Sequence, residues 1–331
     1  MVRENINELA IVIPAYKIDF FEETLKSLSN QTCKDFTVYV GDDCSPSDFG
    51  SLIEEYKDRI DIRYTKFKTN LGGKDLVAQW TRCIELTEGE PWLWLFSDDD
   101  VMGERCVEAF YKEIEGGAKF DIYHFNVDII NEYNTIVQTP PSYPPLISSM
   151  DFFIQKESAK ISSFVVEYIF SRDAFNKVGG FQNFDMAWGS DSATWVKLGM
   201  NKGIKTIKGD RVKWRFSSQN ITPKMDSIMA AKKVTANIEY IDWSNGYFNN
   251  NVIRRFNIYH FFRLMVFYSL TLRKNDRLNL ISKAIKKKII PSWFGFLLRY
   301  CFILLVISKY VKQNYLTRVL KHSVITNTET R

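Results

Sequence analysis

The sequence lacks several short motifs that identify common enzyme classes. No G-x-G-x-x-G follows its first apolar run, which excludes a Rossmann dehydrogenase, and no G-K-[S/T] phosphate loop is present. Its five cysteines are scattered, odd in number and without C-x-x-C spacing, which indicates reduced thiols and not a disulfide framework or a zinc site. The three histidines show no metal-ligand spacing, and the chain has neither an internal repeat nor a low-complexity tract.

Long apolar runs are absent from the first part of the chain. Residues 1–8 are polar and charged, and the apolar run at 9–13 is too short for a secretory signal. Together with the reduced cysteines, this predicts a cytoplasmic protein. The 331 residues, 45% of them hydrophobic, suffice for one large α/β domain or two modest ones.

Acidic residues are scarce in the last third of the chain. Residues 232–331 hold 18 Lys and Arg against 4 Asp and Glu, whereas the whole chain carries a net charge of only +5. We therefore expect an acidic catalytic domain over 1–230 and a basic tail over 231–331 that meets an anionic partner. A membrane surface is favoured over nucleic acid, because this tail is also rich in apolar residues.

Two apolar runs in the tail, at 256–272 and 289–308, bear on how it would meet a membrane. A spanning helix needs about 20 apolar residues, and a proline and an arginine interrupt the second run. Lysines at 283–288 beside Trp293 are typical of a segment that lies on the membrane surface, here the inner face of the cell membrane. The alternative is that these helices pack on the catalytic domain or on a second subunit in a homodimer.

Short apolar runs alternate with amphipathic segments along the first hundred residues. Strands alternating with helices predict a mostly parallel sheet, whose ligand lies beyond the carboxyl ends of the strands. The predicted strands cover 9–15, 36–41, 61–67 and 92–96, and the predicted helices cover 20–30, 47–58 and 74–87. Further along, we expect a long loop at 134–150, helices at 151–158 and 191–200, and a strand at 163–170.

Acidic residues directly follow two of the predicted strands. Asp98, Asp99 and Asp100 come after the run Trp-Leu-Trp-Leu-Phe-Ser, and Asp42 and Asp43 end the second strand. Three adjacent carboxylates repel one another, so a divalent cation with oxygen ligands, Mn²⁺ or Mg²⁺, is a natural partner for the triplet. Such a cation would also neutralise a diphosphate leaving group. The alternatives are a solvated acidic loop for the triplet and a helix N-cap for the pair.

Taken in order, these segments resemble the family 2 glycosyltransferases of GT-A fold. Ile-Val-Ile-Pro-Ala-Tyr-Lys at 11–17 is similar to the family's opening strand, Val-Gly-Asp-Asp-Cys-Ser at 40–45 to its Val-Asp-Asp-Gly-Ser, and Asn-Leu-Gly-Gly at 70–73 to its Asn-x-Gly. The triplet lies where the family carries its DxD motif, and Gly-Gly-Phe at 179–181 precedes the place of its Glu-Asp motif. The resemblance covers roughly residues 9–220. It implies a Rossmann-like α/β fold of the GT-A type with a C-terminal helical extension.

The resemblance also implies which residues bind the nucleotide. Asp43 would bind the base, Lys74 would contact the base or a phosphate, and Asp98 would approach the ribose. The other residues implied to line the nucleotide-binding half, at about 1–103, are Pro14, Ala15, Tyr16, Asp42, Asn70 and Gly73.

For the metal, the resemblance implies Asp99 as a ligand. The first Asp of the family's DxD motif is Ser97 in this chain. Asp100 is therefore the candidate for a second ligand, or for a partner that orients the first.

In the acceptor half, at about 104–230, Asp191 matches the Asp of the family's Glu-Asp motif, while the Glu is replaced by Ser190. A hydroxyl acceptor needs a carboxylate to take its proton, and one base acting opposite the leaving diphosphate gives inversion. The alternative for Asp191 is a cap of the helix that follows. Arg215 lies where relatives carry a basic loop near the diphosphate, and an ion pair at the surface is its alternative.

The sequence as a whole predicts an inverting, metal-dependent glycosyltransferase that uses a nucleotide sugar such as a UDP-sugar. Its acceptor would be a saccharide or lipid-linked saccharide in bacterial surface polysaccharide assembly. Two other functions fit part of the sequence. A sugar nucleotidylyltransferase would carry a glycine-rich phosphate loop where this chain has residues 14–17, and a non-catalytic saccharide-binding protein would not need Asp99 and Asp191.

Overall fold

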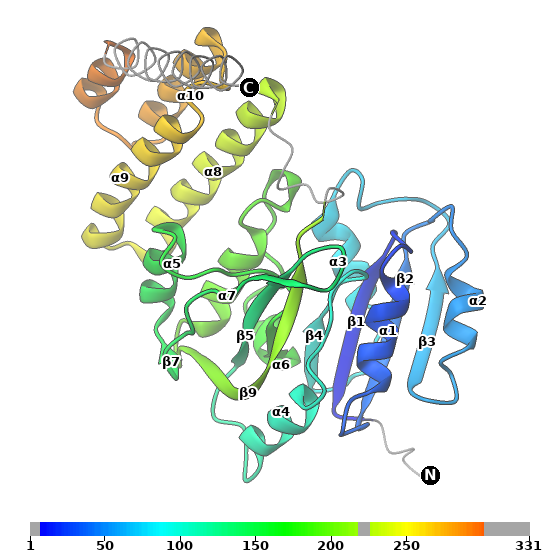
Figure 1. The fold of residues 1–331 in the computed structure, drawn as a ribbon. Coiled ribbons are helices and arrows are strands. Elements are labelled where there is room, and N and C mark those ends of the chain that lie inside the picture. Colours follow the sequence, from blue (N-terminus) through cyan, green and yellow to red (C-terminus); the bar gives the residue numbers. More distant parts are fainter. Residues whose placement is uncertain (1–6, 218–225, 301–331) are drawn as a thin grey trace, which may run out of the picture. The chain divides into compact units, whose positions relative to one another are not determined.

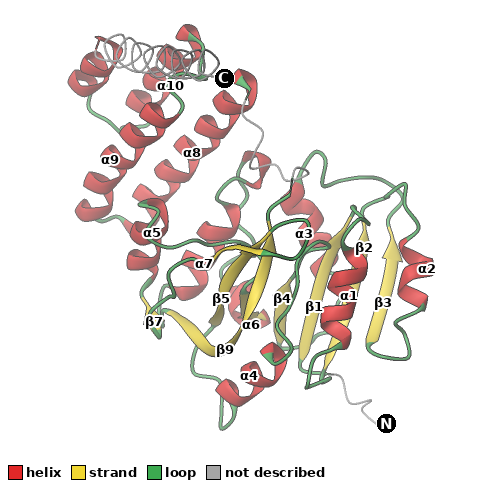
Figure 2. Cartoon of the chain, in the orientation of Figure 1, coloured by secondary structure: helices red, strands yellow, loops and turns green. Residues whose placement is uncertain are grey.

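The computed structural model describes residues 7–217 and 226–300. The chain divides into two compact units, Met1–Pro223 and Lys224–Arg331. The first unit is a β-sheet with helices on both faces, and the second is helical in its described part (Figures 1 and 2).

The first unit is built on a nine-stranded sheet in the order β3-β2-β1-β4-β8-β5-β9-β7, with β6 paired to β5. The first four strands of this order run parallel to one another. The chain adds β2 and β3 on one side of β1 and β4 on the other, so the direction of winding reverses between β1 and β4. Ligands of such sheets bind at this reversal. The strands are β1 Leu9–Ala15, β2 Phe36–Asp42, β3 Asp61–Lys66, β4 Trp92–Leu95, β5 Ile122–Ile130, β6 Ile136–Gln138, β7 Leu146–Ile147, β8 Tyr168–Ser171 and β9 Ile204–Arg215.

Helices cover both faces of this sheet, because right-handed crossovers on either side of β1 lead to opposite faces. In Figure 1, α1 lies in front of the sheet, and α6 and α7 lie behind it. Helix α1 buries Phe21, Leu25 and Leu28, which recur at helical spacing and join the core with β1. The helices of this unit are α1 Phe21–Ser29, α2 Phe49–Glu54, α3 Leu76–Ile84, α4 Cys106–Ile114, α5 Ser149–Glu157, α6 Arg172–Lys177, the short η1 Asp185–Ala187 and α7 Ser190–Gly199.

The prediction of an α/β fold built on a mostly parallel sheet is confirmed, and so are the alternating strands and helices of the first hundred residues. The prediction of a continuous loop at 134–150 is wrong in part, because the short strands β6 and β7 lie within it. Its four prolines stand between these strands, where a missing N–H breaks no ladder bond. Strands β5 and β9 and helices α4 and α6 were not predicted. The strand β9 carries five Lys or Arg residues, which hide the apolar alternation that marks a strand.

The second unit packs its helices around an apolar core of its own. They include α8 Ser227–Phe248, α9 Asn251–Phe267 and α10 Lys274–Lys286. An ion-pair network joins α8 to α10, in which Lys287 Nζ lies 2.7 Å from carboxylate oxygens of both Glu239 and Asp242. No helix within 7–217 and 226–300 is long and apolar enough to cross a membrane. The end of the predicted apolar run at 289–308 lies outside the described residues.

Candidate functional site

Three loops meet at the edge of the sheet where β1, β2 and β4 end. Strands β1 and β2 end in register, with Ala15 opposite Asp42. Tyr16 follows β1, Asp43 follows β2, and Asp98 lies in the turn after β4. The residues expected to bind a nucleotide therefore lie at the reversal between β1 and β4, the part of such a sheet that ordinarily binds a ligand.

Asp98 connects two of these loops. Its Oδ2 atom accepts the backbone N–H groups of Tyr16 and Lys17 at 2.7 and 2.8 Å, and the residue is only 8% exposed. Burial and the neighbouring charge of Asp99 raise the pKa of the Asp98 carboxyl to about 7, while the two N–H donors oppose the rise. A ribose hydroxyl at this carboxylate would meet its Oδ1 atom.

Asp99 and Asp100 differ in what their carboxylates contact. Asp99 accepts a hydrogen bond from the Ser97 hydroxyl at 2.6 Å, whereas Asp100 accepts the backbone N–H of Arg215 at 2.6 Å. Asp100 is 1% exposed, and burial together with the charge of Asp99 raises its pKa well above the ordinary value. Asp100 thus supports the turn from beneath, and Asp99 is the better placed of the two to meet a cation.

The triplet fits a divalent cation only in part. Among the residues that the structure describes, no group of three or more His, Cys, Asp or Glu side chains is arranged to hold a metal ion by itself. A cation at Asp99 would therefore take most of its oxygen ligands from a diphosphate and from water, as Mg²⁺ commonly does at phosphate sites.

Asp43 fixes the loop that precedes α3. Its two carboxylate oxygens accept the N–H groups of Leu71 and Gly72 at 2.7 and 2.8 Å. Arg82, on α3, forms an ion pair with the same carboxylate. An imide N–H of a nucleotide base would have to share Asp43 with these donors. Arg82 was not predicted as a site residue, because the sequence shows only that it lies on the polar side of an amphipathic helix.

The other residues expected to bind the nucleotide divide into buried supports and exposed groups. Asp42 is fully buried and accepts hydrogen bonds from the Ser45 N–H at 2.7 Å and the Tyr64 hydroxyl at 2.6 Å. Ala15 is also fully buried, and neighbouring Pro14 lies within β1. These residues shape the site through the backbone.

The exposed groups are Tyr16, Asn70, Gly73 and Lys74. Tyr16 is 46% exposed, and an exposed aromatic side chain is suited to pack on a base. Asn70 accepts the Gly73 N–H at 3.0 Å and shapes the turn that carries Lys74.

Arg215, at the end of β9, is fully buried beneath the triplet. Its Nε donates to the Asp99 carbonyl at 2.7 Å, its Nη1 to the Asn131 carbonyl at 3.0 Å, and its Nη2 to Asn134 Oδ1 at 2.8 Å. The guanidinium also forms an ion pair with Glu23 on α1. These bonds engage all three nitrogens of the guanidinium.

Asp191 is half-buried in the first turn of α7. The N-cap residue of this helix is Gly189, with a left-handed φ of 81°, so Asp191 does not cap it. The segment before α7 reaches α3, where Asn183 donates to an Asp75 oxygen at 3.1 Å. Because Asp75 directly follows the loop at 70–74, this bond joins the segment before α7 to the loop that Asp43 holds.

Charged groups from two other elements surround Asp191. Burial raises the pKa of Asp191 above the ordinary value, the Lys156 ammonium opposes the rise, and Glu157 adds to it. Lys156 Nζ itself lies 2.8 Å from Glu157. Before β8, Glu167 is fully buried, and burial with the charge of Asp191 raises its pKa well above the ordinary range. These neighbours of Asp191 could not be predicted, because they come from distant parts of the chain.

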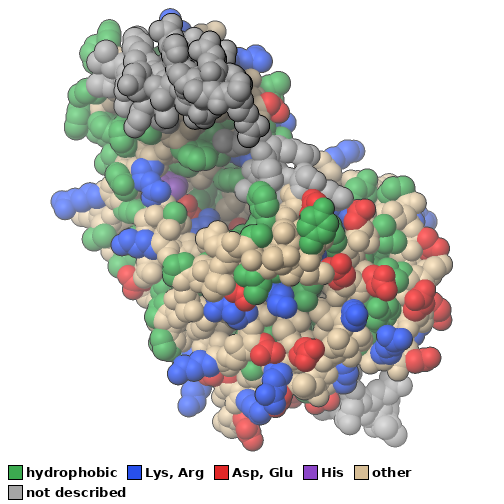
Figure 3. Space-filling model, viewed as in Figure 1, with side chains coloured by type: hydrophobic (Ala, Val, Ile, Leu, Met, Phe, Trp, Pro, Cys, Tyr) green, Lys and Arg blue, Asp and Glu red, His purple; other side chains and the backbone are tan. Residues whose placement is uncertain are grey.

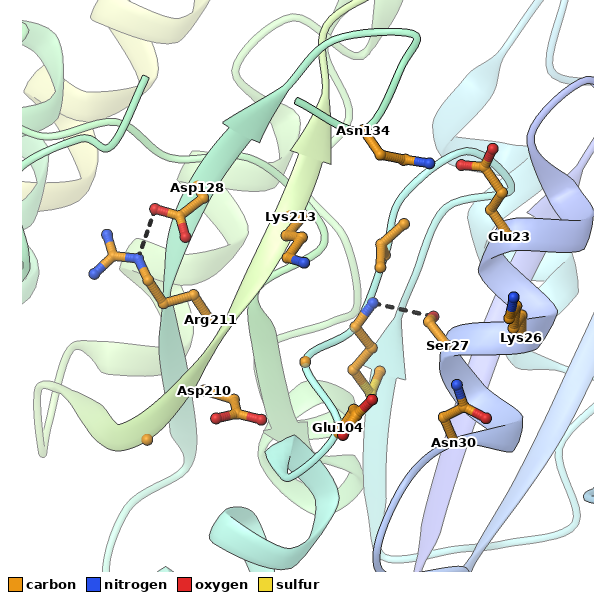
Figure 4. A pocket seen from close by; sticks show the side chains of 14 residues that line it. Glu23, Lys26, Ser27, Asn30, Glu104, Asp128, Asn134, Asp210, Arg211 and Lys213 are labelled. Carbon is orange, nitrogen blue, oxygen red and sulfur yellow. Dashed lines mark hydrogen bonds and ion pairs between the residues drawn. The ribbon is translucent and has the colours of Figure 1, made fainter. Parts of the chain in front are cut away.

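A groove of about 840 Å³ lies beside the triplet, between α1 and β9 (Figure 4). Its floor includes Val101 and Met102, which directly follow Asp100. Val101 pairs with Lys213 through two backbone hydrogen bonds of 2.8 and 3.0 Å. In Figure 4, Glu23 and Asn134, the two side chains that hold Arg215, lie at one end of the groove.

Comparison with known proteins identifies the family of this chain. The family described as Glycosyl transferase family 2 matches residues 10–178, which is half of the chain. One relative is the poly(ribitol-phosphate) beta-N-acetylglucosaminyltransferase TarS of Staphylococcus aureus, 27% identical over 126 residues. That match covers 37% of this chain and only 20% of TarS. Another is the GalNAc(5)-diNAcBac-PP-undecaprenol beta-1,3-glucosyltransferase of Campylobacter jejuni, 23% identical over 222 residues, or 65% of this chain and 67% of the relative.

Solved structures show the same fold. The crystal structure of residues 1–349 of S. aureus TarS matches with a TM-score of 0.56 at 15% identity, covering 94% of this chain and 91% of that one. The structure of the same fragment in complex with UDP-GlcNAc matches with a TM-score of 0.53 at 14% identity, covering 94% and 92%. The predicted GT-A-like fold with a helical C-terminal part is thereby confirmed, and the chain belongs to glycosyl transferase family 2.

Proposed function

We propose that this protein is an inverting glycosyltransferase that moves a sugar from a nucleoside-diphosphate sugar to a hydroxyl of a saccharide acceptor. The observation that carries the proposal is the sheet edge where Tyr16, Asp43 and Asp98 meet, joined by Asn183 to the segment that bears Asp191. The names of the relatives support an acceptor in bacterial cell-surface polysaccharide, since one acts on poly(ribitol phosphate) and another on an undecaprenol-linked glycan.

In this proposal the nucleotide lies at the carboxyl ends of β1 and β4, where the direction of winding of the sheet reverses. The exposed ring of Tyr16 packs on the base, Asp43 accepts the imide N–H of a uracil, and the free oxygen of Asp98 binds the ribose. Lys74 is exposed and lies in the turn that Asp43 holds through the N–H groups of Leu71 and Gly72. From this turn its ammonium group contacts the base or a phosphate. Uracil is favoured as the base because the structural relative TarS has been crystallised with UDP and with UDP-GlcNAc.

Asp99 would hold a divalent cation, Mn²⁺ or Mg²⁺, whose charge would stabilise the diphosphate as it leaves. Asp100 and the backbone of the turn support Asp99 from beneath, through their bonds to Arg215. In this arrangement Asp99 alone would bind the cation and Asp100 would support it. That fits a motif in which the first Asp of the family pattern is replaced by Ser97.

Asp191 acts as the general base. Its carboxylate accepts the proton of the acceptor hydroxyl while that oxygen bonds to the anomeric carbon and the bond from this carbon to the diphosphate oxygen breaks. Attack opposite the leaving group inverts the configuration, as in inverting glycosidases, where one carboxylate activates a water. The raised pKa of Asp191 makes it a stronger base than an exposed carboxylate.

We also propose that the basic tail lies on an anionic membrane surface, near a lipid-linked acceptor. The exposed side chains of Trp293, Phe296 and Tyr300, each at least 60% exposed, come directly after the lysines at 283–288. Aromatic side chains beside basic residues are typical of interfacial helices. Figure 3 shows hydrophobic and basic side chains together on the helical unit.

The experiment that tests the proposed function separates it from its two rivals. The purified protein is incubated with Mn²⁺ and each of a panel of UDP- and GDP-sugars, with and without oligosaccharide acceptors, and release of UDP or GDP is measured. A glycosyltransferase releases the nucleoside diphosphate. A sugar nucleotidylyltransferase instead releases pyrophosphate from a nucleoside triphosphate and a sugar phosphate, and a non-catalytic saccharide-binding protein releases neither.

A further inference from the structure

We infer that Arg215 is a positioning residue, which holds the acidic turn in the shape that lets Asp99 meet the diphosphate and its cation. This inference rests on the proposed function and assigns to Arg215 a part that needs no contact with the donor. It follows from the two elements, α1 and the loop after β5, that the guanidinium joins to the turn.

The first step is the contact of Arg215 with the turn itself. Its side-chain Nε donates to the carbonyl of Asp99 at 2.7 Å, and its backbone N–H donates to the carboxylate of Asp100 at 2.6 Å. One residue therefore holds two consecutive residues of the triplet. By contrast, the side chain of Asp99 is held by a short-range bond to the Ser97 hydroxyl, within the turn.

The second step is what holds Arg215. Its Nη2 donates to Asn134 Oδ1 at 2.8 Å and pairs with Glu23 on α1, and its Nη1 donates to the Asn131 carbonyl at 3.0 Å. Its guanidinium also stacks 4.3 Å from the centre of the Phe20 ring. Helix α1 and the loop after β5 thus fix the guanidinium from the side opposite the triplet.

The contacts of residue 215 require the guanidinium of arginine. A fully buried cation is costly unless its donors are satisfied, and here four bonds leave the guanidinium in different directions. The planar fork of arginine sets these directions, whereas the single ammonium of lysine cannot serve Asp99, Asn131 and Glu23 together. Replacing Arg215 with lysine should keep the charge and lose the geometry.

The test compares binding that needs the acidic turn with binding that does not. UDP with Mn²⁺ engages Asp99, whereas uridine alone engages the base pocket around Tyr16 and Asp43. Both affinities are measured by calorimetry in the full-length protein. For Arg215→Lys, we expect the affinity for UDP with Mn²⁺ to fall about 10- to 100-fold, the usual effect of losing a residue that orients a metal ligand, and the uridine affinity to stay the same.

Two variants on the far side of the guanidinium test the inference without altering Arg215. Glu23→Gln keeps a hydrogen-bond acceptor and removes the charge. Asn134 adopts a φ of 60°, which strains alanine, so Asn134→Gly is the truncation that leaves the backbone relaxed. Both should weaken binding of UDP with Mn²⁺ by a smaller factor than Arg215→Lys. Glu22→Gln, on the exposed side of the same helix, is the matched control and should change nothing.

Three results would overturn the inference. The first is equal loss of uridine and of UDP·Mn²⁺ affinity, which means that Arg215 only supports the fold. The second is full UDP·Mn²⁺ affinity in Arg215→Lys. The third, decisive if that variant does not fold, is full UDP·Mn²⁺ affinity in both Glu23→Gln and Asn134→Gly.

A separate measurement distinguishes failure of the inference about Arg215 from failure of the proposed function. If the wild-type protein binds neither UDP nor GDP with Mn²⁺, the proposed function fails. Hydrogen exchange of the amides at 98–101, measured without ligand, then still reports on the turn. Faster exchange there in Glu23→Gln and Asn134→Gly supports a positioning role, and unchanged exchange contradicts it.

Discussion

The carboxylate of Asp98 accepts the backbone N–H of Tyr16 at 2.7 Å, across the point where the winding of the sheet reverses. This bond joins the loop after β1 to the turn after β4. In the proposed function the first carries the base and the second the diphosphate, so a single carboxylate keeps the two ends of the nucleotide site at a fixed separation. The buried Asp98 therefore belongs to the framework of the site as much as to its surface.

Removal of this carboxylate should loosen the whole nucleotide edge. Asp98→Ala leaves the N–H groups of Tyr16 and Lys17 without their acceptor, which we expect to cost about 1–3 kcal/mol in the free energy of unfolding. Chemical denaturation measures this loss. Asp58→Ala, at an exposed position, is the control and should leave the stability unchanged. An equally stable Asp98→Ala protein would show that water replaces the carboxylate.

The metal proposal predicts a sharper effect at Asp99. Asp99→Asn should abolish turnover and Mn²⁺-dependent binding of UDP without lowering the melting temperature, because an amide oxygen can still accept the Ser97 hydroxyl and loss of the charge relieves its repulsion with Asp98 and Asp100. Nucleoside diphosphate release and calorimetry measure the two effects. Full activity in the variant, or in the wild-type protein with excess chelator, would refute the role of Asp99.

The proposed base makes a prediction that separates chemistry from donor binding. Asp191→Asn should bind UDP with Mn²⁺ as the wild type does and lose transfer by a factor of about 10² to 10⁴, the usual contribution of a general base. In the wild-type protein kcat/KM should fall as the pH drops through the raised pKa of Asp191, since the base must be ionised to accept a proton. Donor affinity that collapses in the variant would point to a structural role.

The edge of the site could be predicted from the sequence, but its interior could not. Apolar runs that end in Pro-Ala-Tyr, Gly-Asp-Asp and Ser-Asp-Asp-Asp mark the carboxyl ends of buried strands, and parallel strands bring those ends together. The triplet alone gave no sign that Asp100 turns inward to Arg215, because that choice depends on a strand more than a hundred residues away in the chain.

Arg215 shows why the partners of a buried charge cannot be predicted from the sequence. Glu23, Asn131 and Asn134 are of common residue types and lie in two separate elements. A lone arginine in a basic strand is ordinarily a surface residue, so its full burial follows only from the three-dimensional arrangement. The fold class depends on patterns repeated along the chain, which sequence can show, whereas each of these contacts occurs once.

Glu167 predicts a dependence of stability on pH. Its pKa is raised in the folded protein by burial, so the folded state is stable with the carboxyl protonated and loses stability as the pH rises from the unfolded pKa through the raised folded one. Glu167→Gln keeps the acceptor for the Phe164 N–H, at 2.7 Å, and cannot ionise. The melting temperature of the variant should therefore exceed that of the wild type increasingly between pH 5 and pH 8. Parallel melting curves would contradict the burial of a titrating carboxyl.

The basic tail makes the last prediction, which concerns where the protein acts. With 18 Lys and Arg against 4 Asp and Glu, residues 232–331 should bind vesicles of anionic lipid, at about 1 kcal/mol for each well-placed basic residue. The double variant Trp293→Ser/Phe296→Ser should bind them less tightly, since both side chains are at least 60% exposed and can enter the interface. Tyr133→Ser, at an 84% exposed aromatic residue of the first unit, is the matched control.

Co-sedimentation with anionic and with neutral vesicles at low and high salt distinguishes three outcomes for this tail. Binding that needs anionic lipid and weakens with salt supports a peripheral tail, because exposed charges are screened at high ionic strength. Binding that only detergent reverses would mean that the run at 289–308 inserts. No binding to either vesicle would contradict the membrane proposal, and a homodimer in analytical ultracentrifugation that Trp293→Ser/Phe296→Ser dissociates would then identify these aromatic residues as a contact between subunits.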